Sequence, residues 1–336
     1  MPTIPLQHYL GQLNLPQPDS HKGQNGKALL VGGSDLFHAA IRWSFLAASR
    51  ITDMTFYSSV AENNAIMHDA KMYGHNGVIV PRSELVSYLE EVDSVLIGPG
   101  MRRDIPTRFS QDQLQNIKPT DLSTHDWESD SLAVTRVLTR AGSDKKWVID
   151  AGALQVIEPV WVPKKAVLTP HASEMLRLAA KVSPKMQQFW SEFLADKPFQ
   201  QPDNSPLVAS SHPQISPPTS LTPSQTEALH TFSHTCNSAT FILKGSVDLI
   251  WNAQTIVTVS GGNAGMTKGG SGDVLAGSLV GFLASSEPLP SAVVASYLNK
   301  LAGHNLYQRS GTFFNSSDLA DALPNAWKEM ITSQDE

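Results

Sequence analysis

Short apolar stretches rich in β-branched residues alternate along this chain with longer segments of helical periodicity. The stretches expected to be strands are residues 28–33, 54–60, 77–80, 94–98, 147–151, 166–169, 240–243, 247–251 and 256–260. The segments expected to be helices are residues 39–50, 63–72, 85–91, 132–140, 173–180, 225–236, 274–284, 289–307 and 317–329. This alternation is typical of βαβ units, so the sequence predicts a mostly parallel sheet with helices on both faces.

Four of the expected strands are followed by loops of small and polar residues. These loops are Gly32-Gly33-Ser34, Gly98-Pro99-Gly100, Asp150-Ala151-Gly152 and Thr169-Pro170-His171. In open parallel sheets, ligands bind beyond the carboxyl ends of the strands. The four loops together therefore predict a ligand site at one edge of the sheet, although each loop taken alone is also consistent with a simple turn.

The glycine-rich run at residues 261–277 is the most specific local feature of the chain. Glycine lets successive backbone N–H groups turn toward one anion, and the apolar segment 274–284 that follows reads as a buried helix. The amino end of that helix adds unpaired N–H groups and a positive partial charge. Asp273 stands where the turn meets the helix, so it is either a helix cap or a base beside a bound phosphate.

Two segments interrupt the alternation. Residues 102–128 are polar, and residues 183–223 are rich in proline, serine and glutamine. Long irregular stretches in a compact domain are usually insertions, lids or disordered segments. We therefore expect one domain over residues 1–336 with surface insertions at both segments, and we favour disorder over a lid for the second.

Composition excludes several classes of protein. The net charge is −6 without a basic run, which argues against a nucleic-acid surface. No apolar run reaches membrane-spanning length, and the amino terminus has no secretory pattern. The single cysteine, Cys236, fits a reducing compartment, and the histidines lack zinc spacing. These observations predict a soluble cytoplasmic protein without nucleic-acid or membrane partners.

Several motifs together resemble one family. They occupy residues 26–34, 97–100, 148–154, 168–174, 243–245 and 265–277, and they occur in the order that the family has. The most specific are Thr169-Pro170-His171-Ala172-Ser173-Glu174 and the run from Gly265 to Gly277. The chain resembles the ADP-dependent NAD(P)H-hydrate dehydratases of the ribokinase-like superfamily. This resemblance implies a ribokinase-like three-layer α/β/α fold.

The resemblance also implies a repair reaction. A nicotinamide dinucleotide that has gained water, the S-epimer of NADH or NADPH hydrate, is returned to NADH or NADPH. ADP or ATP drives the loss of water and becomes AMP or ADP with free phosphate, and Mg²⁺ neutralises phosphate charge. We expect a homo-oligomer without an epimerase domain, so that a separate epimerase would act in the same pathway.

Site residues follow from the same resemblance. Asp273 would be the catalytic base, and Gly270, Ser271 and Gly272 would hold the transferred phosphoryl group. The hydrated dinucleotide would be bound by Asp273 and by the positions Ala40, Gly100 and His171. The driving nucleotide would be bound by Lys244, Gly245, Ser246, Val247, Asp248 and Gly272. Glu174 would organise Mg²⁺ through water.

The chain departs from the family pattern at several positions, among them the run Phe37-His38-Ala39-Ala40-Ile41, where the family usually has Tyr-x-Gly-Ala-Pro. Ala39 replaces a usual glycine beside the expected substrate path, and Gly152 occupies a place that is often acidic. Asp248 replaces a frequent threonine, and since a carboxylate near phosphates would repel them, we expect it to point at ribose or solvent.

Structural alternatives remain open for other residues. His171 and Glu174 are also consistent with loop and helix-end roles, and Asp150 with a turn. Lys268 either compensates the negative charge of a bound phosphate or is simply a solvated charge on its loop.

Two other functions share these motifs. A ribokinase-like small-molecule kinase would use the same glycine-rich turn and aspartate to phosphorylate a sugar, a hydroxymethylpyrimidine or a thiazole alcohol. A nucleotide-binding sensor would have kept the pocket and lost turnover. Two further readings fail, since the chain has no Walker A motif and no Gly-x-Gly-x-x-Gly run after its first strand.

Overall fold

A computed structural model describes residues 3–71, 77–103, 107, 109–116, 130–198, 212–218 and 220–332. Its strands form one ten-stranded sheet in the order β3-β2-β1-β4-β5-β6-β8-β9-β10-β7. The strands are β1 Lys27–Val31, β2 Met54–Ser58, β3 Val78–Ile79, β4 Ser94–Ile97, β5 Lys146–Ile149, β6 Ala166–Leu168, β7 Ile215–Ser216, β8 Thr240–Leu243, β9 Asp248–Trp251 and β10 Ile256–Val259. The pairs from β3 to β8 are parallel, and the pairs involving β9 and β10 are antiparallel.

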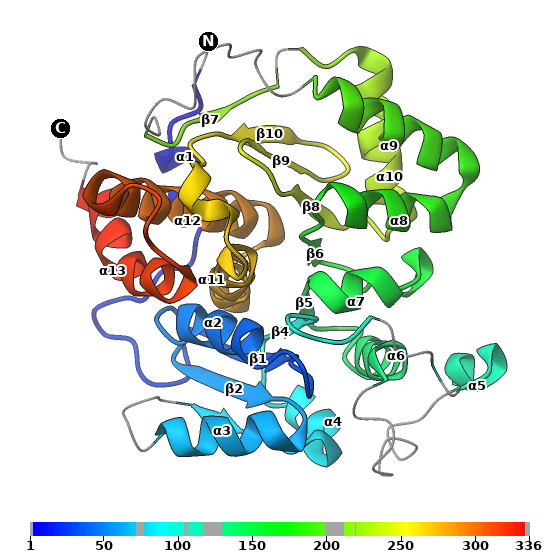
Figure 1. Ribbon diagram of the computed structural model, residues 1–336, viewed down its shortest axis with the longest axis vertical. Coiled ribbons are helices and arrows are strands. Elements are labelled where there is room, and N and C mark those ends of the chain that lie inside the picture. Colours follow the sequence, from blue (N-terminus) through cyan, green and yellow to red (C-terminus); the bar gives the residue numbers. More distant parts are fainter. Residues whose placement is uncertain are drawn as a thin grey trace.

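Helices cover both faces of this sheet, with α2, α11, α12 and α13 on one side and α6 to α10 on the other (Figure 1). The α-helices are α1 Gln7–Leu10, α2 Ala39–Ala48, α3 Ala61–Lys71, α4 Leu85–Leu89, α5 Gln111–Asn116, α6 Ser131–Ala141, α7 Ala151–Val156, α8 Ala172–Val182, α9 Pro184–Asp196, α10 Pro223–Thr235, α11 Ser271–Ser285, α12 Pro288–Ser310 and α13 Ser316–Thr332. Within the described ranges, 3₁₀ turns lie at Arg82–Glu84, Pro159–Trp161 and Ala264–Thr267. The predicted three-layer α/β/α architecture is confirmed.

Helix α11 lies at the centre of one layer. Every side chain from Val274 to Ala284 is buried, because the helix packs against the sheet on one side and against α2 and α12 on the others. A helix buried all round is apolar all round, which is why the sequence shows a continuous apolar run there. This packing fixes the amino end of α11 against the edge of the sheet where the site lies.

Each predicted strand and helix has a counterpart in the structure, with ends displaced by a few residues. The structure adds β7 and the helices α1, α5, α7 and α9. The expected disorder over residues 183–223 is wrong where α9 and β7 lie, since Trp190 and Phe193 of α9 are buried in the core. Residues 199–211 and 219 of that segment, and 104–106, 108 and 117–128 of the other, lie outside the described residues.

The α9 helix begins with a recognisable signal. Ser183 caps it by accepting a hydrogen bond from the Met186 amide, and Pro184 occupies its first position. Proline is favoured there because its missing N–H has no partner in a helix and its φ is already helical. The expectation of disorder rested on the proline, serine and glutamine content of residues 183–223, whereas Pro184 starts a helix.

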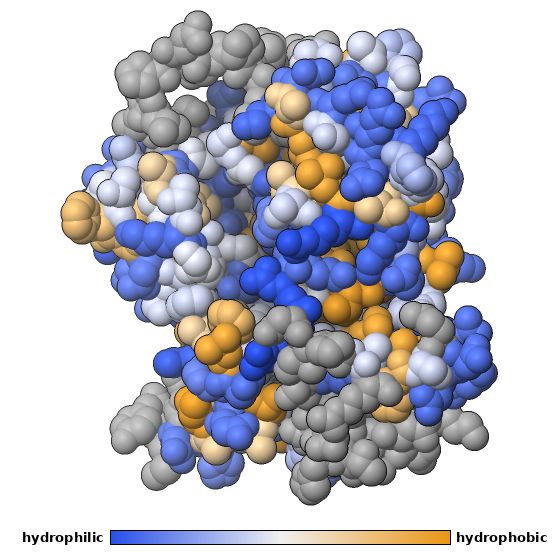
Figure 2. Space-filling view, turned by 45° about the vertical axis from the view of Figure 1, so that its right-hand side comes forward, coloured by the Kyte–Doolittle hydropathy of each residue, from blue (hydrophilic) through white to orange (hydrophobic). Residues whose placement is uncertain are grey.

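The surface seen in Figure 2 is mostly hydrophilic, with smaller apolar areas between the polar side chains. No helix in the described part of the chain combines the length and the apolar character needed to span a membrane.

Candidate active site

The loops predicted to hold the site do meet at the carboxyl edge of the parallel strands. After β1 the chain forms β2 on one side of β1, and it later forms β4 on the other side of β1. The gap between β1 and β4 is therefore a topological switch point, where the strand order reverses. The Gly33 amide donates a 2.7 Å hydrogen bond to the Pro99 carbonyl across this gap. A Cβ on Gly100 would lie 3.3 Å from the Cβ of Ala40, so the structure brings these two predicted dinucleotide positions together.

The glycine-rich turn leads directly into α11. Gly270 is the N-cap residue, with φ of +101°, a conformation that residues with a Cβ rarely adopt. A Cβ on Gly270 would lie 2.4 Å from the Trp43 ring, and the Ser316 hydroxyl donates to the Gly269 carbonyl at 2.8 Å. Helices α2 and α13 thus hold the turn in place from both sides. The amides of Gly272 and Asp273 lie in the first turn of α11, where a helix offers no internal acceptor.

Asp273 is not a helix cap. Its carboxylate makes no capping hydrogen bond, and within the described residues no hydrogen-bond donor reaches it; only its backbone carbonyl is bound, by Ser44 at 2.8 Å. Burial raises the pKa of Asp273 to about 7, with a further rise from Asp150 and a smaller one from Glu174, while Lys244 lowers it. A carboxylate with this pKa accepts a proton readily near neutral pH, which suits a general base.

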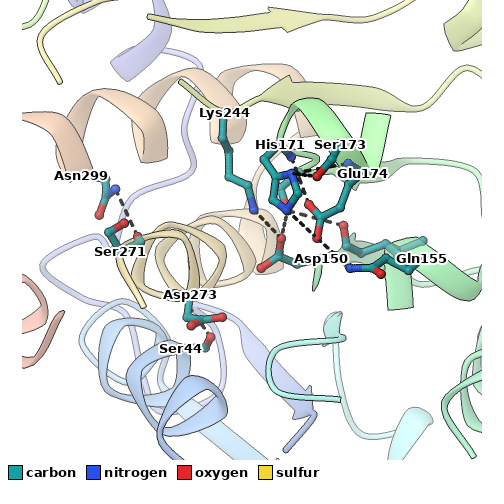
Figure 3. Close-up of polar contacts among 12 residues, drawn as sticks. Ser44, Asp150, Gln155, His171, Ser173, Glu174, Lys244, Ser271, Asp273 and Asn299 are labelled. Atoms are coloured by element: carbon teal, nitrogen blue, oxygen red, sulfur yellow. Dashed lines mark hydrogen bonds and ion pairs between the residues drawn. The ribbon is translucent and has the colours of Figure 1, made fainter. Parts of the chain in front are cut away.

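Lys244 and Asp150 form a partly buried ion pair near this carboxylate (Figure 3). The Lys244 Nζ atom lies 2.7 Å from Asp150 Oδ1, which also accepts from the Thr169 hydroxyl at 2.7 Å. A Cβ on Gly272 would lie 3.4 Å from the same Nζ, so the ammonium group also faces the glycine-rich turn. Burial alone would lower the pKa of Lys244, but the carboxylates of Asp150, Glu174 and Asp273 raise it, so the side chain is a cation.

His171 and Glu174 form a capping box at the start of α8. The His171 ring nitrogen Nδ1 accepts from the Glu174 amide at 3.4 Å, and Glu174 Oε2 accepts from the His171 amide at 3.0 Å. Burial lowers the pKa of His171, although Glu174 opposes this shift. Both residues therefore have the helix-end role that the sequence left as an alternative. Glu174 is buried, with an exposed fraction of 3%.

The residues present fit a Mg²⁺ ion held mainly by phosphates and water. Asp150 and Glu174 both act on the pKa of Asp273, so three carboxylates share one region of the site. Among the described residues, however, no group of three or more side chains is arranged to hold a metal ion directly. Mg²⁺ usually keeps several waters and binds substrate phosphates together with one or two carboxylates of the protein. This region of the site supplies such carboxylates.

The 244–248 segment leads from β8 into β9, whose first residue is Asp248. The expectation that the Asp248 side chain can point at solvent is wrong. Asp248 is 4% exposed and points inward: it accepts from the Gly245 amide at 2.9 Å and from the Ser296 hydroxyl at 2.6 Å. Lys300 of α12 lies 3.4 Å from the same carboxylate. The Asp248 side chain therefore faces α12 and not solvent, because the packing of α12 against this loop supplies a buried partner.

Lys268 is an exposed residue of the glycine-rich turn, and both interpretations of its charge stay predictions. Its ammonium group donates to the carbonyl oxygens of Thr312 and Phe314, so it ties the glycine-rich turn to the α12–α13 connection. Of the departures at Ala39 and Gly152, only the second has a packing reason. Ala39 is the exposed first residue of α2, and a Cβ on Gly152 would lie 2.5 Å from the Met101 carbonyl oxygen, which excludes an acidic side chain.

Sequence reasoning gave no role to four residues that shape the site: Trp43, Lys300, Ser316 and, as an ion-pair partner, Asp150. For Asp150 a signal existed, since a carboxylate directly after a buried apolar strand lies at the ligand edge of a parallel sheet. The other three come from helices whose sequence does not reveal which loop they touch.

Comparison with known proteins gives several relatives. An ADP-dependent (S)-NAD(P)H-hydrate dehydratase of Cenarchaeum symbiosum is 28% identical over 320 residues, covering 92% of this chain and 91% of that protein. A bifunctional NAD(P)H-hydrate repair enzyme of Methanocaldococcus jannaschii is 27% identical over 318 residues, covering 92% of this chain and 50% of that protein. The chain thus spans about half the length of such bifunctional relatives and most of the length of the single-function one.

The fold is shared with solved structures. An ADP/ATP-dependent NAD(P)H-hydrate dehydratase of Bacillus subtilis, co-crystallised with ATP and Mg²⁺, has a TM-score of 0.66 and 22% identity, and 98% of each chain is covered. The model of the NAD(P)H-hydrate dehydratase family matches residues 28–196 and 210–325, which includes most of the segment expected to be the second insertion. This protein therefore belongs to the NAD(P)H-hydrate dehydratase family.

Proposed function

We propose that this protein returns the S-epimer of hydrated NADH or NADPH to NADH or NADPH, driven by hydrolysis of ADP or ATP to AMP or ADP and phosphate. Its family and the activities named for its relatives support this proposal. The observation that carries it is the state of Asp273, a carboxylate without hydrogen-bond donors among the described residues, at the start of α11 and with a pKa near 7.

The first step would be phosphoryl transfer to the hydroxyl group of the hydrated ring. Asp273 would take the proton of the hydroxyl group as the hydroxyl oxygen forms a bond to the terminal phosphorus of the nucleotide. The bond between that phosphorus and the leaving nucleotide, AMP or ADP, breaks in the same step. The amides of Gly270, Ser271 and Gly272 would face the transferred group, where developing negative charge needs N–H donors. The Lys244 ammonium, next to Gly272, adds a fixed positive charge at the same place.

The second step would release phosphate. Hydroxide is a poor leaving group, whereas the phosphate now attached to the ring carbon departs easily together with the neighbouring ring proton, and the double bond reforms. ADP or ATP would lie along the segment Lys244–Asp248, and the hydrated ring would lie near Ala40, Gly100 and His171. When bound, Mg²⁺ would neutralise phosphate charge, with Asp150 and Glu174 holding it through water.

The test is a direct assay of repair. The protein is incubated with NADH hydrate, Mg²⁺ and either ADP or ATP, and the NADH absorbance band is followed while AMP or ADP and free phosphate are quantified. We expect the band to return in proportion to the phosphate released. If neither nucleotide restores the band, the proposal is wrong, and formation of a stable phosphorylated alcohol from a sugar, hydroxymethylpyrimidine or thiazole substrate would favour the kinase alternative.

The partners follow from this chemistry. The reaction consumes one epimer, so we propose that a separate epimerase supplies it from the other. We also propose that the protein acts as a homo-oligomer in the cytoplasm, where its buried thiol Cys236 stays reduced. Sedimentation of the purified protein tests the assembly.

A further inference from the structure

A buried ion pair lies behind the segment that would bind the driving nucleotide. Lys300 and Asp248 are 3% and 4% exposed, and their charged groups are 3.4 Å apart. The two residues lie far apart in the chain, on α12 and at the first position of β9. Charged groups are rarely buried unless they are paired, so this pair requires an explanation.

Every polar group of the pair is engaged with the loop or with α12. The Lys300 Nζ atom donates to the carbonyl oxygens of Gly245 and Ser246 at 2.9 and 3.0 Å. Asp248 Oδ1 accepts from the Gly245 amide, and Oδ2 accepts from the hydroxyl of Ser296, one turn before Lys300 on α12. The loop is therefore fixed through three of its backbone groups by two opposite charges.

The charges also bear on what the loop can bind. An uncompensated carboxylate at position 248 would repel the phosphates of a nucleotide lying along residues 244–248. Lys300 cancels that charge at close range, and its hydrogen bonds hold the carbonyl oxygens of Gly245 and Ser246 on the α12 side of the loop.

We propose that Lys300 and Asp248 act as one positioning unit, which shapes the 244–248 segment for a nucleoside diphosphate or triphosphate and neutralises it there. The inference rests on the proposed function, because it takes this segment as the nucleotide site. Neither residue touches the reacting atoms, so both are positioning residues and not catalytic ones.

A double-mutant cycle on ADP binding tests the unit. The variants are K300M, which removes the cation at similar length, D248T, which keeps a side-chain oxygen for the Gly245 amide, and the combination D248T/K300M. Each single variant leaves one buried charge unpaired, so we expect each to raise the dissociation constant for ADP about tenfold or more. In the combination no charge is left, and we expect ADP affinity within about threefold of the wild type.

The matched control is S291A, on the same helix and equally buried, which we expect to leave ADP affinity unchanged. In steady-state assays the single variants should raise KM for ADP much more than they lower kcat, which a general loss of folding would not do. Single variants that bind ADP normally, or a combination no better than the single variants, would overturn the inference. A wild-type protein that fails to bind ADP would instead count against the proposed function.

Discussion

The ammonium group of Lys244 lies 2.7 Å from the carboxylate of Asp150 and at the same time faces Gly272 in the first turn of α11. This contact joins the ends of β8 and β5 to the glycine-rich turn. It also places two opposite charges near Asp273, where Asp150 raises the pKa of the Asp273 carboxyl group and Lys244 lowers it. Burial is the main cause of the raised pKa of Asp273, and the two charges of the ion pair shift it in opposite directions.

The pH dependence of the reaction should follow this balance. In the wild type, kcat/KM should fall about tenfold per pH unit below pH 7, since only ionised Asp273 accepts a proton. K244M should move this acid limb to higher pH because the cation that lowers the pKa is gone. D150N should move it to lower pH because a neighbouring negative charge is gone. Profiles measured with residual activity check both signs, and shifts in the same direction would exclude the proposed balance.

Removal of the base should separate chemistry from binding. D273N keeps the size of the side chain but cannot take a proton, so turnover should fall by about 100- to 10,000-fold. The dissociation constant for ADP, measured by calorimetry, should stay within about threefold of the wild type, because the phosphate-facing groups are backbone amides. A variant with an unimpaired rate would remove Asp273 from the role of base.

The same substitution should stabilise the fold at alkaline pH. The folded-state pKa of Asp273 is about 7 against 3.8 for an ordinary aspartate, so the ionised carboxylate destabilises the folded state above pH 7. This cost fades as the pH falls through 7 and is absent below about pH 4. D273N should therefore raise the free energy of unfolding at pH 8 by on the order of 1 kcal/mol, after allowance for solvent screening. Urea titrations at pH 8 and pH 5 check this, and an equal gain at both would contradict it.

A methyl group at Gly270 should disrupt the turn. The positive φ disfavours any residue with a Cβ by about 1–2 kcal/mol, and the new atom would also meet the Trp43 ring. G270A should therefore lower Tm and greatly reduce turnover. The matched control is G269A, where a Cβ would meet nothing within 4 Å and φ is not positive, so its Tm should stay close to that of the wild type. Equal loss of stability in both variants would refute the strain argument.

Local patterns predicted much of this molecule correctly. The apolar run after Asp273 identified α11, and the small residues after β1, β4, β5 and β6 identified the edge of the sheet where the site lies. Both signals are short in sequence and depend on the period of apolar residues and on the conformational freedom of glycine. The α9 helix was missed although its start signal is local, because the whole segment 183–223 was interpreted from its content of proline, serine and glutamine.

Other features depend on contacts between residues far apart in the chain. Lys268 could not be assigned from its own surroundings, since its partners Thr312 and Phe314 lie across the fold. Asp248 was expected to point at ribose or solvent, whereas the fold places Lys300 of α12 beside its carboxylate. The environment of a charge depends on which groups the tertiary fold places within a few ångströms, and sequence separation does not report that distance.

The sequence by itself determined the layers of the fold, the position of the glycine-rich turn and the identity of the carboxylate beside it, because each is encoded by residues that are neighbours in the chain. Only the tertiary structure decided which charges pair, that Asp273 is not a helix cap, and that its pKa lies near 7. These properties arise from burial and from charges on separate strands and helices, which become neighbours only when the sheet and its helices have assembled.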